Sequence, residues 1–386
     1  MTLLSLLNNR RVRDLFWQIA AVAALIAILT LFIRNASENM VKAGIASGFD
    51  FLGRNSGIDV AFVLTGYTEK DTIFALFWAG VANTLFVSVI AAVLASLLGF
   101  VIGLARLSPH WLLSKIAGVY VELVRNIPLL FFVLFWYFGV IAALPAPRDS
   151  IILAGAAFLN NRGLTVPWPD TPGVFAIALA AILAAGLAQT ALSIFARRRK
   201  AATGRDFPIV STGLALLIGA PLLILAAAAF ATSWDVPALR GFNYRGGRVL
   251  IPEFVALLAA LVTYTAAFIA EIVRGGIAAI GHGQREASAA LGLRPGQTLR
   301  LVVIPQALRI MIPPLTSQYL NVLKNSSFGA AIAFPELVSL FMGSALNNVG
   351  QAIEIIAMTL AVYLVIGLAI SALMNWYNAR IALVSR

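Results

Sequence analysis

The sequence predicts an all-α polytopic membrane protein, and three observations support this prediction. Apolar residues make up 61% of the 386 residues and charged residues only 11%, whereas soluble domains average about 45–50% and about 25%. Eight apolar runs are each long enough to cross a bilayer core, which takes about 20 helical residues. Basic residues gather in alternate segments between those runs, as they do in the cytoplasmic loops of membrane proteins.

The apolar runs predict eight transmembrane helices. They cover residues 16–33, 76–104, 116–143, 173–196, 207–232, 250–273, 310–341 and 353–376. The first run follows Arg10, Arg11 and Arg13, as a secretory signal would. Its length exceeds the roughly 7–15 apolar residues of a cleavable signal, so we expect a retained anchor.

The distribution of charge predicts the orientation of these helices. With the N-terminus inside, the cytoplasmic segments hold 17 lysines and arginines and the outer segments hold 9. The run from Arg197 to Lys200 is the clearest marker of the inner side. Both termini are therefore expected in the cytoplasm. The outer loop that contains Arg240, Arg245 and Arg248 runs against this bias.

Several classes of function are excluded by composition and by missing motifs. The net charge of +12 is explained by membrane orientation, so nucleic acid is not an expected partner. The absence of cysteine and the presence of only His110 and His282 exclude thiolate and histidine-rich metal sites. No G-x-x-x-x-G-K-[ST] phosphate loop, hydrolytic triad or glycine-rich dinucleotide turn is found. We expect no catalytic residue and no bound cofactor or metal, and any ATP and Mg would be used by another polypeptide.

The predicted helices fall into two kinds. Those between residues 173 and 232 are rich in Ala, Leu and Ile and are expected to pack against lipid. The stretches 76–143 and 250–376 carry polar residues and prolines, which a membrane tolerates only in a protein interior or a wet pathway. We therefore expect a working core of five helices. The expected divisions are 1–75, 76–143, 144–249 and 250–386, the last with a cytoplasmic loop at 274–309.

A polar segment at residues 274–305 interrupts the apolar pattern. Residues 284–291 are good helix formers, with Ala287, Ala290 and Leu291 on one stripe. Gly292 stands where a helix end needs a positive φ, and Pro295 follows where that helix cannot continue. A second helix is expected from residue 297. Such a hairpin fits a groove on a partner protein, or it merely links two membrane helices.

A motif in this segment resembles the EAA loop of bacterial ABC-transporter permeases. Glu286-Ala287-Ser288 is followed after three residues by Gly292, after nine more by Val302, and then by Ile304-Pro305. The spacing agrees throughout, with Ser for Ala, Val for Ile and Ile for Leu. The resemblance implies that the loop forms the coupling helix that enters a cleft of a cytoplasmic ATPase dimer. The residues it assigns to this contact are Gln284, Arg285, Glu286, Ala287, Ser288, Gly292, Arg294, Pro295 and Gly296.

Further segments resemble polar amino-acid permeases, in the enlarged form that transports general L-amino acids or glutamate, glutamine and aspartate. These segments are 120–130, 263–276, 323–327 and 335–337. The resemblance implies a five-helix (MetI-like) ABC importer permease core with an extra N-terminal helix and an inserted pair. It also implies ATP-driven amino-acid uptake across the bacterial inner membrane, with a second, distinct permease subunit and a periplasmic amino-acid-binding protein. The alternative is an ion-coupled secondary transporter, which usually shows internal repeats.

Two pairs of charged residues lie at the ends of predicted helices. Glu122 and Arg125 are three residues apart, as are Glu271 and Arg274. Residues at this spacing are neighbours on a helix surface and can form ion pairs. They are expected either to act as gating latches or to be ordinary ion pairs.

Polar residues inside the membrane helices are candidates for a translocation path. Gln318, Asn321 and Asn325 share one helix face with Lys324 on its edge, and Pro313 and Pro314 precede them. Such a stripe either bonds neighbouring helices or lines a wet path, and the buried cation favours the path.

Two residues of an earlier helix are also path candidates, namely Asn83 and Thr84. Threonine in a membrane helix, however, commonly bonds its own backbone.

Overall fold

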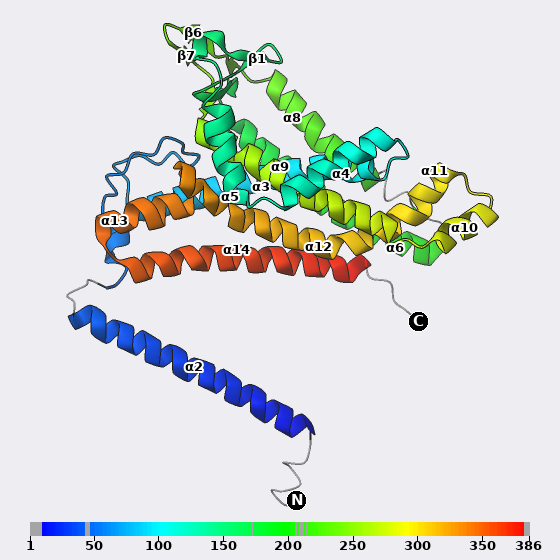
Figure 1. Cartoon of the computed structure of the whole chain (residues 1–386), viewed down its shortest axis with the longest axis horizontal. Coiled ribbons are helices and arrows are strands. Elements are labelled where there is room, and N and C mark those ends of the chain that lie inside the picture. The colour runs from blue at the N-terminus through cyan, green and yellow to red at the C-terminus, as the bar shows by residue number, and fades with distance from the viewer. Residues whose placement is uncertain are drawn as a thin grey trace, which may run out of the picture. The chain divides into compact units, whose positions relative to one another are not determined.

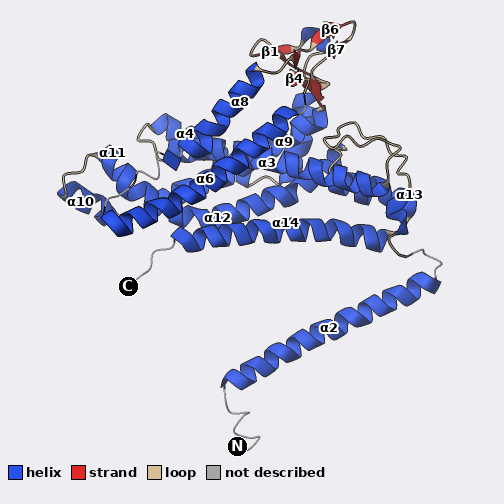
Figure 2. Cartoon of the chain, turned by 180° about the vertical axis from the view of Figure 1, so that it is seen from behind, coloured by secondary structure: helices blue, strands red, loops and turns tan. Residues whose placement is uncertain are grey.

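The computed structural model (Figure 1) describes residues 10–42, 47–171, 173–204, 207, 212–213 and 215–381. The chain divides into two compact units, and each is described by itself. The first unit comprises Met1–Ser88, Leu308–Ala330 and Pro335–Arg386, and the second comprises Val89–Ala307 and Ala331–Phe334. Helices predominate, and the strands gather in one small region (Figure 2).

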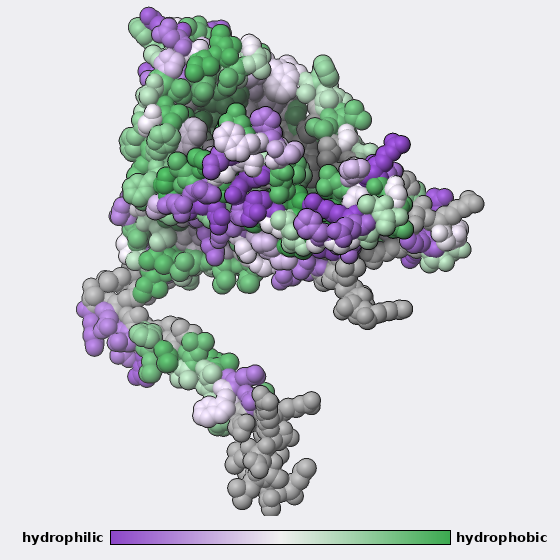
Figure 3. All heavy atoms as spheres, turned by 45° about the vertical axis from the view of Figure 1, so that its right-hand side comes forward, coloured by the Kyte–Doolittle hydropathy of each residue, from purple (hydrophilic) through white to green (hydrophobic). Residues whose placement is uncertain are grey.

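Within the described residues, five helices are long and apolar enough to cross a membrane, or six if one bent pair counts as a span. The five lie in α2 (Arg10–Lys42), α3 (Ile73–Arg106), α9 (Pro252–Ala278), α12 (Ile304–Asn325) with its flanking turns, and α14 (Ala352–Ile381). In α2, hydrophobic residues cover the middle of the helix and hydrophilic residues lie toward its ends (Figure 3). A helix satisfies its own backbone hydrogen bonds in lipid, which accounts for this architecture. The prediction of a helical polytopic membrane protein is confirmed.

The inserted pair of helices is described only in part. The predicted span 173–196 lies in α6 (Gly173–Thr203). Part of the predicted span 207–232 lies outside the described residues, and the rest contains the π-helix η4 (Ala215–Gly219) and α8 (Ala220–Phe230). Helices α6 and α8 pack against each other within the second unit. The count of eight spans stays a prediction.

The predicted single span 116–143 is a sharply bent pair of helices. Helix α4 (Trp111–Arg125) and the segment formed by α5 (Leu129–Leu134) and the π-helix η2 (Phe135–Ile141) meet at 107°. Pro128 caps α5 in an extended conformation, with φ −60° and ψ 142°. Proline has no N–H to donate and disfavours helical geometry in the residue before it, so α4 ends and the chain turns.

Close packing of α3 on α9 organises the helices of the second unit. A Cβ atom built on Gly99 would lie 2.7 Å from Cβ of Ile269, and one on Gly103 would lie 2.7 Å from Cβ of Val273. The two glycines are four residues apart and therefore face the same side of α3. Small residues at this spacing let two membrane helices approach backbone to backbone. Helices α4 and α5 and the π-helix η2 also pack on α9.

Eight short strands form a small structure that we name the β cap, residues 145–171 and 233–251. One sheet has the order β1-β2-β3-β8, and β4-β5 and β6-β7 form two-stranded sheets, all antiparallel. The strands are β1 (Ile151–Leu153), β2 (Ala157–Asn160), β3 (Gly163–Val166), β4 (Trp168–Pro169), β5 (Trp234–Asp235), β6 (Ala238–Arg240), β7 (Asn243–Arg245) and β8 (Arg248–Leu250). The sequence predicted only loops here, because strands of two to four residues are too short to show an alternating pattern. The pairing of β3 with β8 joins the two flanks of the inserted helices.

The polar segment after α9 folds as two helices. These are α10 (His282–Ala290) and α11 (Pro295–Thr298), and α11 continues through the π-helix η5 (Leu299–Val303) into α12. Pro313 and Pro314 lie inside α12, so they remove two hydrogen-bond donors without ending the helix. The helical run ends at Ile332 with the 3₁₀-helix η6 (Ser326–Ile332), and Ala333 has a φ of 59°. The predicted span 310–341 is therefore too long at its C-terminal end.

Apolar residues from distant segments form the core of the first unit. Phe51, Leu76, Phe77, Leu337 and Phe341 are all buried together. They come from the 3₁₀-helix η1 (Asp50–Gly53), from α3, and from the segment that holds the π-helix η7 (Val338–Ala345) and α13 (Leu346–Val349). Helices α12 and α14 lie side by side in both views (Figures 1 and 2).

Candidate functional site

The turn of the α10–α11 hairpin (residues 282–298) depends on one glycine. Gly292 has a φ of 74°, which confirms the predicted positive φ. The N–H of Gly292 donates to the carbonyl of Ala289 at 2.9 Å, and the N–H of Leu293 donates to that of Ser288 at 3.1 Å. This pair of bonds is the Schellman arrangement, which satisfies the last carbonyls of a helix. The N–H of Arg294 then donates to Oε1 of Gln297 at 2.9 Å, which starts α11.

Most of α10 faces outward. Ser288 is its only buried residue, and the Ser288 hydroxyl donates to the carbonyl of Gln284 at 2.6 Å. The predicted stripe of Ala287, Ala290 and Leu291 is exposed, and the side chain of Leu291 is 81% exposed. The other residues assigned to the contact are exposed too, namely Gln284, Arg285, Glu286, Gly292, Arg294, Pro295 and Gly296. The hairpin thus presents an apolar tip that the second unit does not cover.

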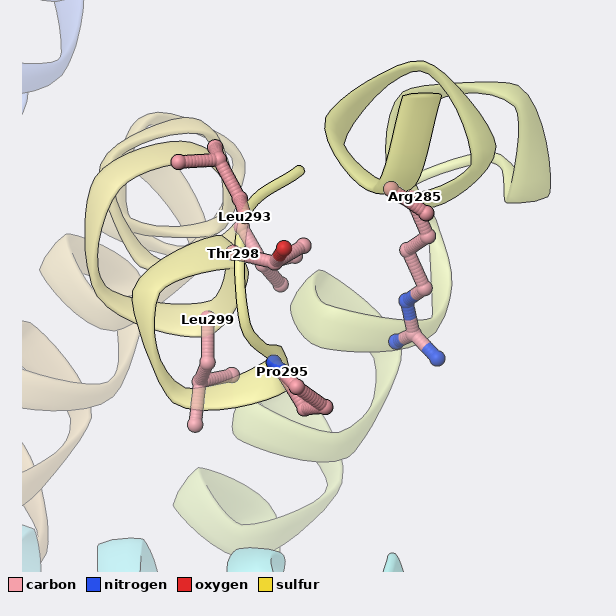
Figure 4. A pocket seen from close by; sticks show the side chains of 7 residues that line it. Arg285, Leu293, Pro295, Thr298 and Leu299 are labelled. Atoms are coloured by element: carbon pink, nitrogen blue, oxygen red, sulfur yellow. The ribbon is translucent and has the colours of Figure 1, made fainter. Parts of the chain in front are cut away.

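A pocket of about 380 Å³ opens between the two helices of this hairpin. It is lined by Arg285, Ala289, Leu293, Pro295, Thr298, Leu299 and Val303. The Arg285 side chain extends from α10 along one side of the pocket, and Leu293, Thr298 and Leu299 lie across from it (Figure 4). An apolar floor with one cation at the rim suits an apolar side chain that has a neighbouring carboxylate.

A cluster of Arg106, Glu271 and Arg274 lies where α3 and α9 approach their C-terminal ends. Nη2 of Arg274 is 2.6 Å from Oε1 of Glu271, which confirms the predicted pairing of these two residues. Arg106 donates a hydrogen bond to the other carboxylate oxygen of Glu271. The side chains of Arg106 and Glu271 are 16% and 26% exposed, so water screens them only in part. Sequence reasoning missed Arg106, although it lies three residues beyond Gly103 on the α3 face that meets α9.

Glu122 and Arg125 do not form the predicted ion pair among the described residues. The guanidinium carbon of Arg125 lies 5.4 Å from the centre of the Phe268 ring, a cation–π distance. The carbonyl of Glu122 accepts a hydrogen bond from the Asn126 amide at 2.7 Å. The helix end after Arg125 leads into the bend, so the local geometry places the guanidinium against α9 instead of back along α4.

Double-mutant cycles are expected to separate these two pairs. Replacing Arg106 and Glu271 by alanine, singly and together, should give a coupling free energy of at least about 1 kcal/mol, because the pair is partly buried. Replacing Glu122 and Arg125 in the same way should give additive effects within about 0.5 kcal/mol. The measurement is the free energy of unfolding of the purified chain in detergent. Equal coupling in both cycles would contradict the structure.

The polar stripe of α12 lies on the surface of the first unit. Asn321 and Lys324 are exposed and Gln318 and Asn325 are half-buried. Within the described part of the chain, none of these four side chains has a hydrogen-bond or ion-pair partner. The stripe therefore does not bond neighbouring helices of this unit, which was the alternative to a path.

Asn83 and Thr84 are buried and bond a turn of the backbone. The Asn83 amide donates to the carbonyls of Phe62, at 2.9 Å, and Pro335, at 2.8 Å. Thr84 Oγ1 accepts from the N–H of Leu337 at 3.0 Å. These contacts fix the chain before η7, so the structure gives the two residues a positioning role within the first unit. Their place on a path stays a prediction.

Glu336 completes this turn and was not singled out as a site residue from the sequence. Its side chain is fully buried, and its carboxylate accepts hydrogen bonds from the N–H of Val338 at 2.8 Å and of Ser339 at 2.7 Å. The Tyr363 hydroxyl on α14 lies 3.3 Å from the same carboxylate. The segment Pro335-Glu336-Leu337 was recognised as a motif, but its capping role depends on α14 and could not be read from spacing.

The described part of the chain combines helices of membrane-spanning length with an exposed polar hairpin. Residues 207–383 match the family described as binding-protein-dependent transport system inner membrane component.

Relatives that match nearly the whole chain identify the kind of transport system more closely. The chain is 50% identical to YhdX of Escherichia coli, provisionally named an amino-acid ABC transporter permease protein, over 98% of this chain and 96% of that protein. It is 45% identical to the general L-amino acid transport system permease protein AapQ of Rhizobium johnstonii, over 99% of this chain and 95% of that protein. The chain therefore belongs to the family of amino-acid ABC transporter permeases. Membership implies an inner-membrane protein that works with an ATPase and a substrate-binding protein.

Two further similarities were found. The chain is 37% identical to the glutamate/glutamine/aspartate/asparagine transport system permease protein BztB of Rhodobacter capsulatus, over 99% of this chain and 96% of that protein. It is also similar to the crystal structure of an amino acid ABC transporter with histidines. That match has a TM-score of 0.48 and 20% identity, and it covers 80% of this chain and 94% of that chain.

Proposed function

We propose that this chain is the transmembrane permease subunit of an ATP-driven amino-acid uptake system. The observation that carries the proposal is the exposed α10–α11 hairpin, whose EAA-like pattern folds as a capped helix with an apolar tip at Leu291. The amino-acid substrate class comes from the names of three relatives that match nearly the whole chain. The chain itself is not an enzyme, and ATP and Mg are used by the partner ATPase dimer.

Energy enters through the hairpin. When ATP closes the ATPase dimer, its two clefts move, and the helix docked in each cleft moves with them. The contact residues are Gln284, Arg285, Glu286, Ala287, Ser288, Gly292, Arg294, Pro295 and Gly296. Helix α9 ends four residues before α10 begins, so motion of the hairpin reaches the cluster of Arg106, Glu271 and Arg274. That cluster, together with Glu122 and Arg125, serves as the gate.

The translocation path runs along the polar face of α12. Gln318, Asn321, Lys324 and Asn325 are unpartnered within the described part of the chain, and a polar face in a membrane requires water or a polar partner. A second permease subunit, distinct from this one, completes the path on that face, and Asn83 and Thr84 hold the neighbouring turn. The ammonium group of Lys324 pairs with the carboxylate of the substrate amino acid. A periplasmic binding protein delivers the amino acid, and both termini lie in the cytoplasm.

The parts of the chain have separate tasks in this proposal. Residues 1–75 form the anchor and an outer loop, 76–143 and 250–386 form the permease core, and 144–249 form the insertion with its β cap. Lipid surrounds the exposed apolar faces, such as that of α2.

Replacing Leu291 by glutamate tests the docking of the hairpin. Leu291 is 81% exposed, so the variant is expected to fold, but its carboxylate would be buried without a partner in the ATPase cleft. We expect retention of the ATPase on the solubilised complex, and amino-acid uptake into vesicles, to fall at least about tenfold, because an unpaired buried charge costs several kcal/mol. Leu291→Met is the matched control and should keep both. Full retention of the ATPase by Leu291→Glu would refute the docking assignment.

A further inference from the structure

The β cap carries an exposed aromatic residue at the tip of a tight hairpin. Arg240 pairs with Asn243 across β6 and β7, which leaves Gly241 and Phe242 as the two turn residues. Gly241 has a φ of 70°, a value that a two-residue turn of this kind requires. The Phe242 side chain is 75% exposed. Phenylalanine contributes nothing to the turn itself, so its position at the tip calls for another explanation.

An arginine from a separate segment is held against this ring. The guanidinium carbon of Arg148 lies 4.5 Å from the centre of the Phe242 ring. Arg148 stands in the 3₁₀-helix η3 (Pro147–Asp149), which is anchored by the buried Pro147 and packs against β7. The ring and the cation therefore form one preorganised surface. Preorganised aromatic and arginine side chains are the residue types that dominate protein interfaces.

The charge around the tip is positive. The β cap contains five arginines and three aspartates. Arg240 directly precedes the turn, Arg245 stands two residues further along β7 from the turn than Asn243 does, and both are exposed. Among the aspartates, Asp235 is used within the cap, since Oδ2 accepts the N–H of Gly247 at 2.8 Å. Basic residues of membrane proteins normally gather in the cytoplasmic loops. Membrane orientation therefore does not explain arginines on the outer side, and we infer that they serve an interaction there.

The β cap lies at the opposite end of α9 from the α10–α11 hairpin. Strand β8 leads directly into α9, and α10 follows its other end. A helix of 27 residues is about 40 Å long, enough to cross the bilayer. If α10 faces the cytoplasm, as the proposed function holds, then the β cap faces outward.

The geometry of the tip argues against burial in lipid. Strands β6 and β7 form a two-stranded sheet, so within the described chain both of its outer edges carry backbone groups that no further strand pairs. An open sheet edge in hydrocarbon leaves these N–H and C=O groups unsatisfied, at a cost of several kcal/mol each. A soluble protein partner leaves the same edges in water.

We propose that the tip formed by Phe242, Arg148, Arg240 and Arg245 is the contact for a soluble, acidic protein on the outer side of the membrane. Phe242 enters an apolar depression on that partner, and the arginines pair with carboxylates around its rim. The inference rests on the proposed function, which supplies such a partner in the amino-acid-binding protein. It assigns a docking role to the insertion, which the five-helix core does not contain.

The test uses the complete wild-type transporter in nanodiscs and the purified amino-acid-binding protein that raises its ATP hydrolysis. We expect Phe242→Ala to weaken binding at least about tenfold, a typical loss for a central aromatic residue. Arg148→Gln should weaken binding and reduce its dependence on salt. Basal ATP hydrolysis and the maximal stimulated rate should stay unchanged. Phe230→Ala, which removes a 92% exposed ring on α8, is the matched control and should bind as the wild type does.

The outcomes separate the inference from the function on which it rests. If no amino-acid-binding protein raises ATP hydrolysis by the wild-type complex, the proposed function fails. If one does, and Phe242→Ala and Arg148→Gln bind it with unchanged affinity, the docking assignment alone is overturned.

A fluorescent label identifies what occupies the tip. The chain contains no cysteine, so Asn243→Cys gives this chain a single labelling site, beside Phe242. A polarity-sensitive fluorophore there should shift to the blue only when the binding protein is added. A shift in nanodiscs alone, quenched by brominated lipid, would overturn the inference in favour of a membrane contact. A shift that depends only on the concentration of the transporter would overturn it in favour of a second copy of this chain.

Discussion

Replacing Gly103 by valine is expected to destabilise the second unit by at least about 2 kcal/mol. A Cβ atom on this residue would lie 2.7 Å from Cβ of Val273 and 2.8 Å from the carbonyl oxygen of Ala270. A backbone oxygen of α9 cannot move aside as a flexible side chain can, so the two helices must separate. Separation of α3 from α9 also withdraws Arg106 from Glu271. Arg106 follows Gly103 by three residues on α3, and Glu271 precedes Val273 by two residues on α9. Gly99→Val should act similarly, since its Cβ would lie 2.8 Å from the carbonyl oxygen of Ala266.

The free energy of unfolding of the purified chain in detergent measures this effect. Gly275→Val is the matched control, because Gly275 lies on α9, the helix against which Gly103 of α3 packs, and no heavy atom would come within 4 Å of its Cβ. Both variants place a β-branched residue in a helix, so the difference between them isolates the packing. Equal losses of stability in Gly103→Val and Gly275→Val would show that the close approach of α3 and α9 is not what stabilises the unit.

Replacing Glu336 by alanine is expected to destabilise the first unit by about 2–4 kcal/mol. The substitution leaves the N–H groups of Val338 and Ser339 without their acceptor in a partly buried position. A buried donor that loses its partner costs about 1–3 kcal/mol, and the removed carboxylate also leaves a cavity. Tyr363 loses a partner as well.

Two further variants give this prediction its controls, with the same unfolding measurement. Glu336→Gln keeps one acceptor oxygen and should lose less stability than alanine. Glu38→Ala should be nearly neutral, because the Glu38 side chain is 53% exposed and its ion pair with Arg34 lies on the surface. A loss for Glu336→Ala no larger than that for Glu38→Ala would show that the carboxylate does not hold the turn.

The sequence predicted the long helices and the turn at Gly292 because these depend on local chemistry. An apolar run of bilayer length forms a helix in lipid, because a helix pairs its own backbone groups. A glycine directly after a helix-forming stretch is typical of a helix C-terminal cap. The bend at Pro128 was missed because the run 116–143 is apolar enough overall to count as one span, and hydropathy does not record the direction of the chain. The β cap was missed because its largest sheet joins β3 to β8, more than 80 residues later in the chain.

Side-chain roles were harder to predict than helices. Asn83 in an apolar helix could face water or bond a neighbour, and its partner Pro335 lies 252 residues away. Arg106 looked like an ordinary basic residue at a helix end, since its partnership with Glu271 depends on the glycine contact between α3 and α9. Glu271 and Arg274 were predicted correctly as a pair because three residues along one helix suffice to bring them together.

The bend between α4 and α5 means that α4 cannot cross a bilayer by itself. At 15 residues, α4 is about 22 Å long, shorter than the roughly 30 Å of hydrocarbon that a full crossing requires. Where α4 ends, at residues 126–128, its last carbonyl groups need hydrogen-bond donors that the helix no longer supplies. The Asn126 amide donates to the free carbonyl of Glu122, and the N–H groups of Asn126 and Ile127 donate to Leu123 and Val124. Asn126 thus caps the end of α4 with both its side chain and its backbone, and the chain can change direction there without leaving these carbonyls unpaired.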